Sequence, residues 1–197
     1  MKNIIAISAC LKRCSIAISY EDNLYEVNEN VDAAANLVWL VDNLVKSKNV
    51  DLKKIEGIVV ASGPGSFTGI RVAQSFAKGL ALSLKLPAVS LSYFDVIESI
   101  CVDENFQDVV IVIKSEKNQI YYKTADKSGI SSYESLANEI NNGAVLIGDA
   151  IEEIIPHLTG KTVRTICNTD FRNARYLLNF SPRITRTSKI SPYYMGN

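Results

Sequence analysis

The stretch that decides the fold is VVASGPGSFTGIRVAQSFAKGLAL, residues 59–82. It begins in a β-branched run, breaks at three glycines and a proline, and resumes as an alanine-rich segment with helical periodicity. This order predicts a strand, a tight loop and a helix, an arrangement that often directs backbone amides at a phosphate. The first question about function is therefore whether this loop binds an anion.

The spacing within the loop excludes one phosphate motif and argues against another. A P-loop needs a second glycine five positions after the first, followed at once by lysine, and here no lysine occurs until Lys78. The dinucleotide fingerprint is nearly matched by Gly63, Gly65 and then Thr68 or Gly69. However, the next predicted strand ends in residues 90–92, which offer no acidic side chain for a ribose.

Two interpretations of the loop remain open. In the first, it is a structural turn whose glycines permit positive φ and whose Ser66 or Thr68 caps the helix. In the second, its exposed amides bind an anion, assisted by Arg71 one turn into the helix. The candidate residues are Gly63, Gly65, Ser66, Thr68, Gly69 and Arg71.

Size and charge restrict the classes of function. The 197 residues are 47% hydrophobic, which suffices for one domain or two small lobes. The charges of the 21 basic and 21 acidic side chains cancel, so no long-range electrostatic field draws the chain to nucleic acid or to an anionic membrane. No run reaches the roughly 18 apolar residues of a membrane span, and the first ten residues do not read as a signal peptide. We therefore expect a cytoplasmic protein.

The metal-ligating side chains are few. Cys10, Cys14, Cys101 and Cys167 show no close pairing except the first two, which flank a predicted turn, and we expect small buried thiols rather than zinc or redox chemistry. His157 is the only histidine, so one chain cannot assemble a histidine-containing metal cluster. The sequence therefore predicts no metal, no cofactor and no catalytic residue.

Hydrophobic periodicity predicts the first of two similar α/β lobes. Three short β-type runs predict an antiparallel meander over residues 4–9, 14–20 and 23–28. Asp32 is placed to cap a helix whose apolar face comprises Ala33, Leu37, Leu40, Val41 and Leu44. A strand, a helix and a strand follow, at residues 55–61, 71–84 and 88–91.

The same order recurs in shorter and more polar form. Strands are predicted at residues 109–114, 119–124 and 144–147, with helices from about 132 and 149. We therefore expect an N-terminal lobe over residues 1–100 and a smaller C-terminal lobe with a tail over residues 101–197.

The glycine stretch, followed by LPAVSLSYFD at residues 86–95, closely resembles the signature of the TsaB family, the glycoprotease-like proteins of tRNA threonylcarbamoyladenosine synthesis. Weaker similarity continues in CSIAI, IVIKSEKNQIYY, GDA and SPYYMGN. The resemblance implies a two-lobed actin-like (ASKHA, ribonuclease H-like) α/β fold, with mixed sheets flanked by helices.

The resemblance also implies a role and partners. TsaB-like proteins are scaffolds that bind and stabilise TsaD, the subunit that transfers a threonylcarbamoyl group to tRNA. A small ATPase, TsaE, completes the assembly, and tRNA is contacted only through the complex. On this basis we expect no catalysis by the chain itself.

Two positions depart from the family pattern. The first strand of the family usually ends in an Asp-Thr pair, which lies near phosphate and metal in active relatives of the fold, whereas this chain has Ser8 and Ala9. A hydroxyl cannot supply the carboxylate that magnesium prefers. Residues 31–33 also lack the histidine often found in the family.

The predicted helices carry more apolar surface than one lobe can bury. On the first, Val38, Trp39 and Val45 extend beyond the core-facing side. On the second, a stripe of small residues would let another helix approach closely, at Ala73, Ala77 and Ala81. These six residues are the predicted partner interface, which the resemblance assigns to TsaD or, in its absence, to a second copy of the chain. The alternative interpretation buries them beneath the tail or the second lobe.

Two other functional classes stay open. A small-molecule kinase or nucleotide-binding enzyme of the same fold would use the glycine loop, with Lys114, Ser115 and Glu116 facing it; these three also suit a hairpin turn. An RNA-binding module would use the late arginines, at 164, 172, 175, 183 and 186, although such patches are usually only solvated.

Overall fold

The computed structural model describes residues 3–10, 13–101, 106–115, 118–167, 170–183 and 190. Within these ranges no helix is long and apolar enough to cross a bilayer. The chain divides into two compact units. The first comprises Met1–Tyr93 and Arg172–Tyr193, and the second comprises Phe94–Phe171 and Tyr194–Asn197. The described residues from Arg172 onward thus group with the N-terminal unit, whereas the sequence analysis had assigned all of 101–197 to the second lobe.

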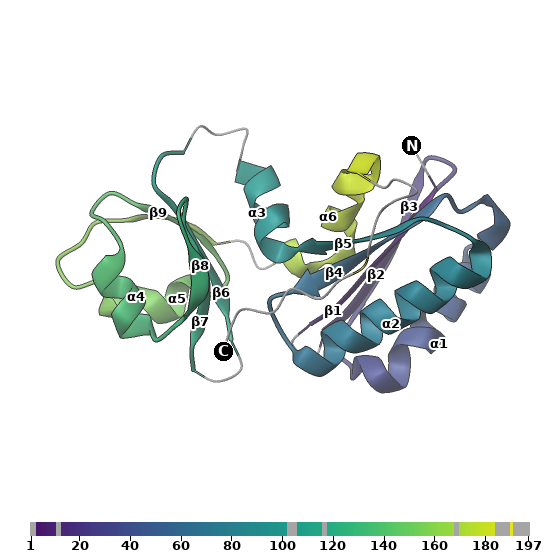
Figure 1. Ribbon diagram of the computed structural model, residues 1–197, viewed down its shortest axis with the longest axis horizontal. Helices are drawn as coiled ribbons and strands as arrows, with labels where there is room; N and C mark the ends of the chain where they lie inside the picture. The colour runs from purple at the N-terminus through teal and green to yellow at the C-terminus, as the bar shows by residue number, and fades with distance from the viewer. Residues whose placement is uncertain are drawn as a thin grey trace. The chain divides into compact units, whose positions relative to one another are not determined.

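The first unit is built on a mixed five-stranded sheet in the order β3-β2-β1-β4-β5 (Figure 1). The antiparallel meander predicted from the sequence is confirmed as β1 (Ile4–Cys10), β2 (Arg13–Tyr20) and β3 (Asn23–Glu29). Glu21 and Asp22 join β2 to β3 with φ of 46° and 63°, as in a two-residue hairpin. Strands β4 (Gly57–Gly63) and β5 (Ala88–Ser92) extend the sheet in parallel from β1.

Two helices cover one face of this sheet, α1 (Ala33–Ser47) and α2 (Phe67–Leu84). Asp32 caps α1 by accepting a hydrogen bond from the Ala34 amide at 3.2 Å, as expected. The predicted apolar face of α1 is buried. It packs in one core with alternate residues of the strands, such as Ile5, Ile7 and Ile16. A short 3-10 turn, η1 (Leu52–Lys54), leads into β4.

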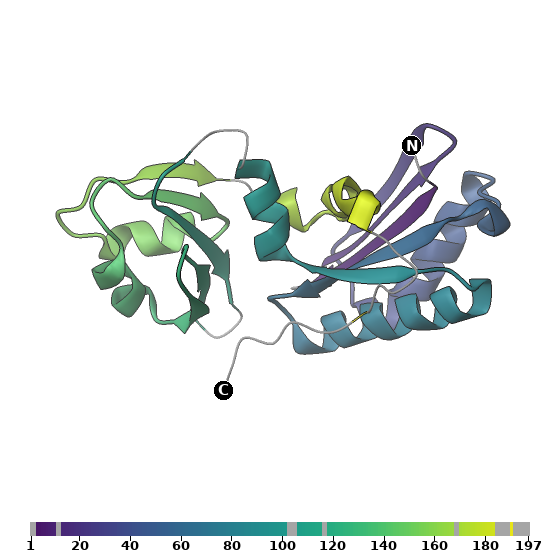
Figure 2. The same cartoon turned by 45° about the horizontal axis from the view of Figure 1, so that its top comes forward.

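The opposite face of the sheet is covered by a segment from late in the chain (Figure 2). This segment contains η4 (Asp170–Arg172), α6 (Ala174–Leu177) and η5 (Leu178–Arg183). Phe171, Ala174, Leu177 and Phe180 are all buried. Sequence analysis did not predict these short elements, because they hold too few turns to show a helical period.

The second unit repeats the sheet order in smaller form, as β10-β9-β6-β7-β8. Its strands are β6 (Val109–Lys114), β7 (Ile120–Lys123), β8 (Ser128–Ser131), β9 (Val145–Gly148) and β10 (Arg164–Cys167). One face packs against α4 (Tyr133–Glu139), α5 (Ile151–Ile154) and η3 (Ile155–His157). The unit also holds most of α3 (Tyr93–Cys101). Two mixed five-stranded sheets flanked by helices confirm the fold class expected from the resemblance; α3, β8 and β10 had not been predicted.

Candidate functional site

The glycine loop joins the end of β4 to the start of α2. Gly63 has a φ of 108°, a left-handed conformation that side chains other than glycine rarely adopt, and its peptide bond to Pro64 is cis. The Ser66 hydroxyl then accepts a hydrogen bond from the Gly69 amide at 3.4 Å, which caps α2. The helix therefore begins at Phe67, one turn earlier than predicted, and Thr68 lies inside its first turn. The cap is Ser66, one of the two candidates.

Gly69 allows the first turn of α2 to pack onto the end of β1. A Cβ atom built on Gly69 would lie 2.4 Å from the carbonyl oxygen of Ala9, closer than any side chain can approach. This contact links the glycine loop to the first strand and explains the glycine without a ligand. Whether the loop amides also bind an anion stays a prediction.

Arg71 is exposed on α2 and lies beside the loop. Its guanidinium stands 3.8 Å from the centroid of the Phe67 ring, in cation–π contact. Arg71 thus contacts Phe67 of its own helix. The sequence analysis did not predict this contact.

The end of β1 is tied to other parts of the first unit by buried hydrogen bonds. The Ser8 hydroxyl donates to the Arg172 carbonyl at 2.6 Å and lies 2.7 Å from the Tyr93 hydroxyl. Because the single hydrogen of Ser8 is used on the carbonyl, the Tyr93 hydroxyl donates to Ser8. Ser8 is 2% exposed and Tyr93 is fully buried, so water does not compete for these bonds.

Strand β2, beside β1, also binds the segment that contains Arg172 and Ala174. Ser15 lies opposite Ser8 on β2, and its hydroxyl accepts a hydrogen bond from the Ala174 amide at 2.7 Å. The same hydroxyl donates to Asn28 on β3 at 2.5 Å. The end of β1 is therefore filled by Ser8, Tyr93 and the backbone of Arg172. Tyr93 lies in the stretch that resembles the family signature. Its hydrogen bond with Ser8 joins residues 85 positions apart, so the local sequence pattern could not predict it.

The outer side of α1 exposes two of its predicted interface residues. Val38 is 64% exposed and Trp39 is 62% exposed, whereas Val45 is half-buried against the core of its own unit. A tryptophan buries a large apolar area when it is covered, so an exposed tryptophan beside a second exposed apolar residue is a candidate contact for a partner. The prediction for Val38 and Trp39 thus agrees with their accessibility.

The alanine stripe of α2 is corrected by the structure. Ala73 and Ala77 are fully buried and Ala81 is 7% exposed, and all three pack in the core that α1 and α2 form on the sheet. Small residues here let α2 approach its own sheet closely, so they are not available to a partner. The exposed apolar residues of this helix are instead Phe67, 54% exposed, and Leu82, 80% exposed.

We define the helical patch as Val38, Trp39, Phe67 and Leu82. Leu82 lies outside the buried side of α2, and the helical period would have revealed it, since it follows the exposed Lys78 by four positions. The helical patch belongs to two helices that pack beside each other on one face of the sheet (Figure 1). Its members are exposed apolar side chains, with Phe67 at the start of α2 and Leu82 near its end, and Trp39 is of a type enriched in protein contacts.

Of the residues proposed for an enzyme, the described ones make contacts within the second unit. Lys114 forms an ion pair with Glu153 at 2.5 Å, and its amide donates to Asp149 at 2.9 Å. Ser115 donates its amide to the Gln119 carbonyl at 3.2 Å, as in a hairpin turn, while Glu116 lies outside the described residues.

The described cysteine and histidine side chains lie in apolar or aromatic surroundings. Cys14 is fully buried, and this burial raises the pKa of its thiol to about 11. His157 stacks on Tyr133, with 6.0 Å between ring centroids. The side chains of Cys10, Cys101 and Cys167 lie outside the described residues. Among the described side chains, no three of the histidine, cysteine and acidic type gather into a possible metal site.

Comparison with known proteins identifies the family. The family described as “TsaD: tRNA N6-adenosine threonylcarbamoyltransferase” matches residues 32–175, more than half of the chain. The tRNA threonylcarbamoyladenosine biosynthesis protein TsaB of Buchnera aphidicola subsp. Acyrthosiphon pisum is 29% identical over 66% of this chain and 62% of its own length. The TsaB of Haemophilus influenzae is 24% identical over 66% of this chain and 56% of its own length. The chain thus spans less than two thirds of these relatives.

A solved structure extends the likeness to the whole fold. It is a protein from Pseudomonas aeruginosa described as similar to the peptidase YEAZ; it is 19% identical, covers 100% of both chains and superposes with a TM-score of 0.77. Together with the signature loop and the paired mixed sheets, these matches confirm the resemblance seen in the sequence. The chain carries a TsaD-type domain and belongs to the TsaB family.

Proposed function

We propose that this chain is a non-catalytic scaffold subunit in the threonylcarbamoyladenosine modification of tRNA, and that it binds and stabilises a TsaD-type transferase. The observation that carries the proposal is the helical patch. Trp39 and Val38 stand out from a helix whose opposite side is buried, and Leu82 does the same on the adjoining helix. A surface of this kind gains stability by burial against a partner.

The end of β1 supports the non-catalytic part of the proposal. The resemblance places an Asp-Thr pair of active relatives there, near phosphate and metal, whereas in this chain Ser8 binds Tyr93 and the Arg172 carbonyl. A magnesium ion would find a hydroxyl and a carbonyl that are both occupied, instead of a carboxylate. The kinase alternative lacks such support, because Lys114 is paired with Glu153.

The proposed assembly follows from the family. TsaD is the direct partner, TsaE joins through the assembly, and tRNA is contacted within the complex. Without TsaD, the helical patch pairs with a second copy of the chain, since the same apolar residues then remain in water. The cytoplasm is the compartment where such a complex would meet its tRNA.

The experiment is co-purification of the cognate TsaD-type transferase with Trp39→Asp. We expect a large loss of bound transferase and a nearly unchanged thermal melt, because an exposed side chain contributes little to the unit's own core. Ile155→Asp is the matched control. It also places a charge on an exposed apolar position, 47% accessible, but lies in the second unit. Equal transferase binding by wild type and Trp39→Asp would remove this residue from the interface.

A second measurement addresses catalysis. The purified chain alone should neither turn over ATP with magnesium nor modify tRNA, and threonylcarbamoyl transfer should appear when the transferase is added. Turnover of ATP by the isolated chain would favour the enzyme alternative instead.

A further inference from the structure

A groove of about 490 Å³ lies beside the last two turns of α2 in the first unit. Three parts of the chain line it: the end of α2, the connection that leads into the start of β5, and Ile190 from late in the chain. The groove shares Leu82 with the helical patch and belongs to no other site described above. A groove of this volume has room for several side chains of another molecule.

Much of the groove lining is apolar, and part of it consists of small side chains. Ala81 and Ala88 line the groove and are almost fully buried in the core of the first unit. Ile190 packs against the same core. Leu82 lines the groove as well, but it is 80% exposed. An apolar side chain of another molecule can therefore pack against Leu82 and lie over the small alanines.

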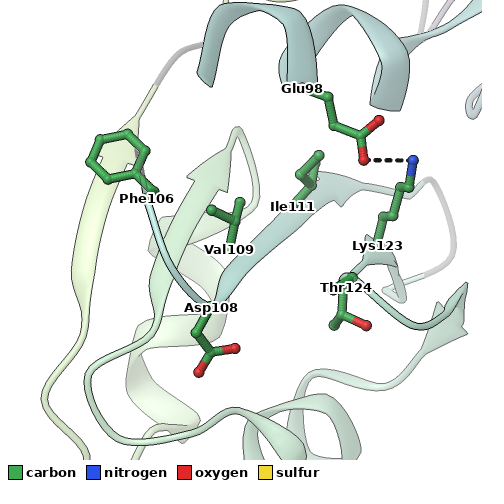
Figure 3. Close-up of a pocket in the computed structure, with 8 residues that line it drawn as sticks. Glu98, Phe106, Asp108, Val109, Ile111, Lys123 and Thr124 are labelled. Atoms are coloured by element: carbon green, nitrogen blue, oxygen red, sulfur yellow. Dashed lines mark ion pairs between the residues drawn. The ribbon is translucent and has the colours of Figure 1, made fainter. Parts of the chain in front are cut away.

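The charged side chains of the groove are both positive. Lys78 and Lys85 line it and are exposed, and the lining includes no acidic side chain. Neither ammonium group forms an ion pair with any residue that the structure describes. A hollow in the second unit differs in this respect, because the Lys123 ammonium on its lining is paired with the Glu98 carboxylate at 2.6 Å (Figure 3). The groove beside α2 thus presents positive charge that the described chain does not neutralise.

The two lysines have the spacing of neighbouring positions on a helical stripe. Lys85 is the C-cap of α2 and follows Lys78 by seven positions, which is two turns of helix. Their Cα atoms are therefore about 10 Å apart along the axis. Leu82 lies between them in the sequence, four positions after Lys78, so all three belong to one side of α2. A second helix with acidic residues seven positions apart would present carboxylates at the same interval, with apolar side chains between them.

We propose that this groove docks an acidic amphipathic helix of a partner protein, with acidic residues at positions i and i+7 and apolar residues at i+3 and i+4. The acidic residues pair with Lys78 and Lys85, and the apolar ones pack on Leu82. Charge complementarity selects this class of partner, because a neutral or basic helix leaves both ammonium groups unpaired. None of the described helices has acidic residues seven positions apart, so a second copy of this chain does not supply the docked helix.

The test is binding of a fluorescent alanine-based peptide to the full chain, measured by anisotropy. The peptide has about 18 residues, so that it is partly helical, with glutamates at i and i+7 and leucines at i+3 and i+4. In the comparison peptide the second glutamate is moved to i+5, which turns it to another side of the helix. We expect the first peptide to bind at least about fivefold more tightly and to shift the amides of residues 78–86. Equal affinity for the two peptides, or no binding of the first, overturns the proposal.

An exchange of charges tests whether the contact is direct. The double variant Lys78→Glu, Lys85→Glu should lose the acidic peptide and should bind a peptide with lysines at i and i+7 better than wild type does. Lys48→Glu is the matched control, because Lys48 is an exposed C-cap, of α1, and does not line the groove. The control carries the same unfavourable charge at a helix C-terminus and should keep the preference for the acidic peptide. Unchanged binding of the acidic peptide by the double variant, with an unchanged thermal melt, counts against the proposal.

Two other occupants of the groove give different results, and either result overturns the proposal. If a second copy of the chain fills the groove, the acidic peptide fails to bind and the double variant loses self-association in sedimentation. If the groove takes a small anionic amphiphile, decanoate shifts the same amides with an affinity equal to that of the peptide. The inference goes beyond the scaffold proposal, because the peptide is tested against the chain without any transferase. Its failure leaves the scaffold proposal standing, and Trp39→Asp tests that proposal separately.

Discussion

The hydroxyl oxygens of Ser8 and Tyr93 lie 2.7 Å apart at the buried end of the first strand. Tyr93 donates to Ser8, and Ser8 donates to the Arg172 carbonyl at 2.6 Å, so three distant parts of the chain meet in one chain of hydrogen bonds. The late segment that covers the first sheet is thereby fixed at the end of the first strand. The end of the first strand is thus closed by the chain's own atoms.

This relationship predicts the effect of Ser8→Ala. The change removes the buried hydrogen bonds that Ser8 makes with the Tyr93 hydroxyl and the Arg172 carbonyl, and we expect the free energy of unfolding to fall by about 1–3 kcal/mol. Chemical denaturation followed by circular dichroism measures this loss. Ser19→Ala is the matched control, since Ser19 is equally buried and its hydroxyl has no partner within the described residues. It should be neutral or slightly stabilising; an equal loss in both variants would show that the Ser8 bonds contribute nothing special.

Gly69 and Gly79 give a paired prediction on one helix. A Cβ on Gly69 would stand 2.4 Å from the Ala9 carbonyl oxygen, whereas a Cβ on Gly79 would meet nothing within 4 Å. Gly69→Ala must therefore move α2 away from β1, and we expect a loss of about 1–3 kcal/mol in the free energy of unfolding. Gly79→Ala should gain about 0.5–1 kcal/mol, because alanine loses less backbone entropy than glycine in a helix. Thermal melts of the two variants should shift in opposite directions, and a common direction would contradict the close approach.

Local sequence patterns predicted much of the fold, because helices and hairpins depend mainly on residues that are close in the sequence. The buried face of α1 follows from its helical period, and the meander follows from alternating short runs around polar turns. The packing of Arg172 and Ala174 onto β1 and β2 joins positions about 160 apart. The hydrophobic periodicity of a segment does not show which distant segment it contacts.

The alanine stripe of α2 shows where sequence patterns are ambiguous. Ala73 and Ala77 repeat at a helical interval, and that repeat looks the same whether the helix faces its own sheet or a partner. Only the structure shows that Ala73 and Ala77 are buried against the sheet of their own unit. The exposure of Trp39 was easier to predict, because five other residues already form the buried face of α1 and Trp39 lies on the other side of the helix. Phe67 was missed because the helix begins a turn earlier than Pro64 and the glycines suggested.

Cys14 provides a prediction on pH dependence. Burial raises the pKa of its thiol to about 11 in the folded chain, from about 9 when unfolded. Between these values the unfolded chain has lost the proton and the folded chain still holds it. The stabilising contribution of the buried neutral thiol is therefore complete below about pH 9 and declines as pH rises toward 11.

The comparison of wild type with Cys14→Ala isolates this effect, because other groups titrate equally in both. We expect the difference in unfolding free energy between the two proteins to change between pH 9 and 11, with wild type losing more. Alkylation gives an independent check: Cys14 of the folded chain should react slowly at pH 8, since both its thiolate fraction and its accessibility are low. Rapid modification of Cys14 in the folded chain, located by peptide mass spectrometry, would mean that β2 is not buried beneath α1 and α2 as the structure has it.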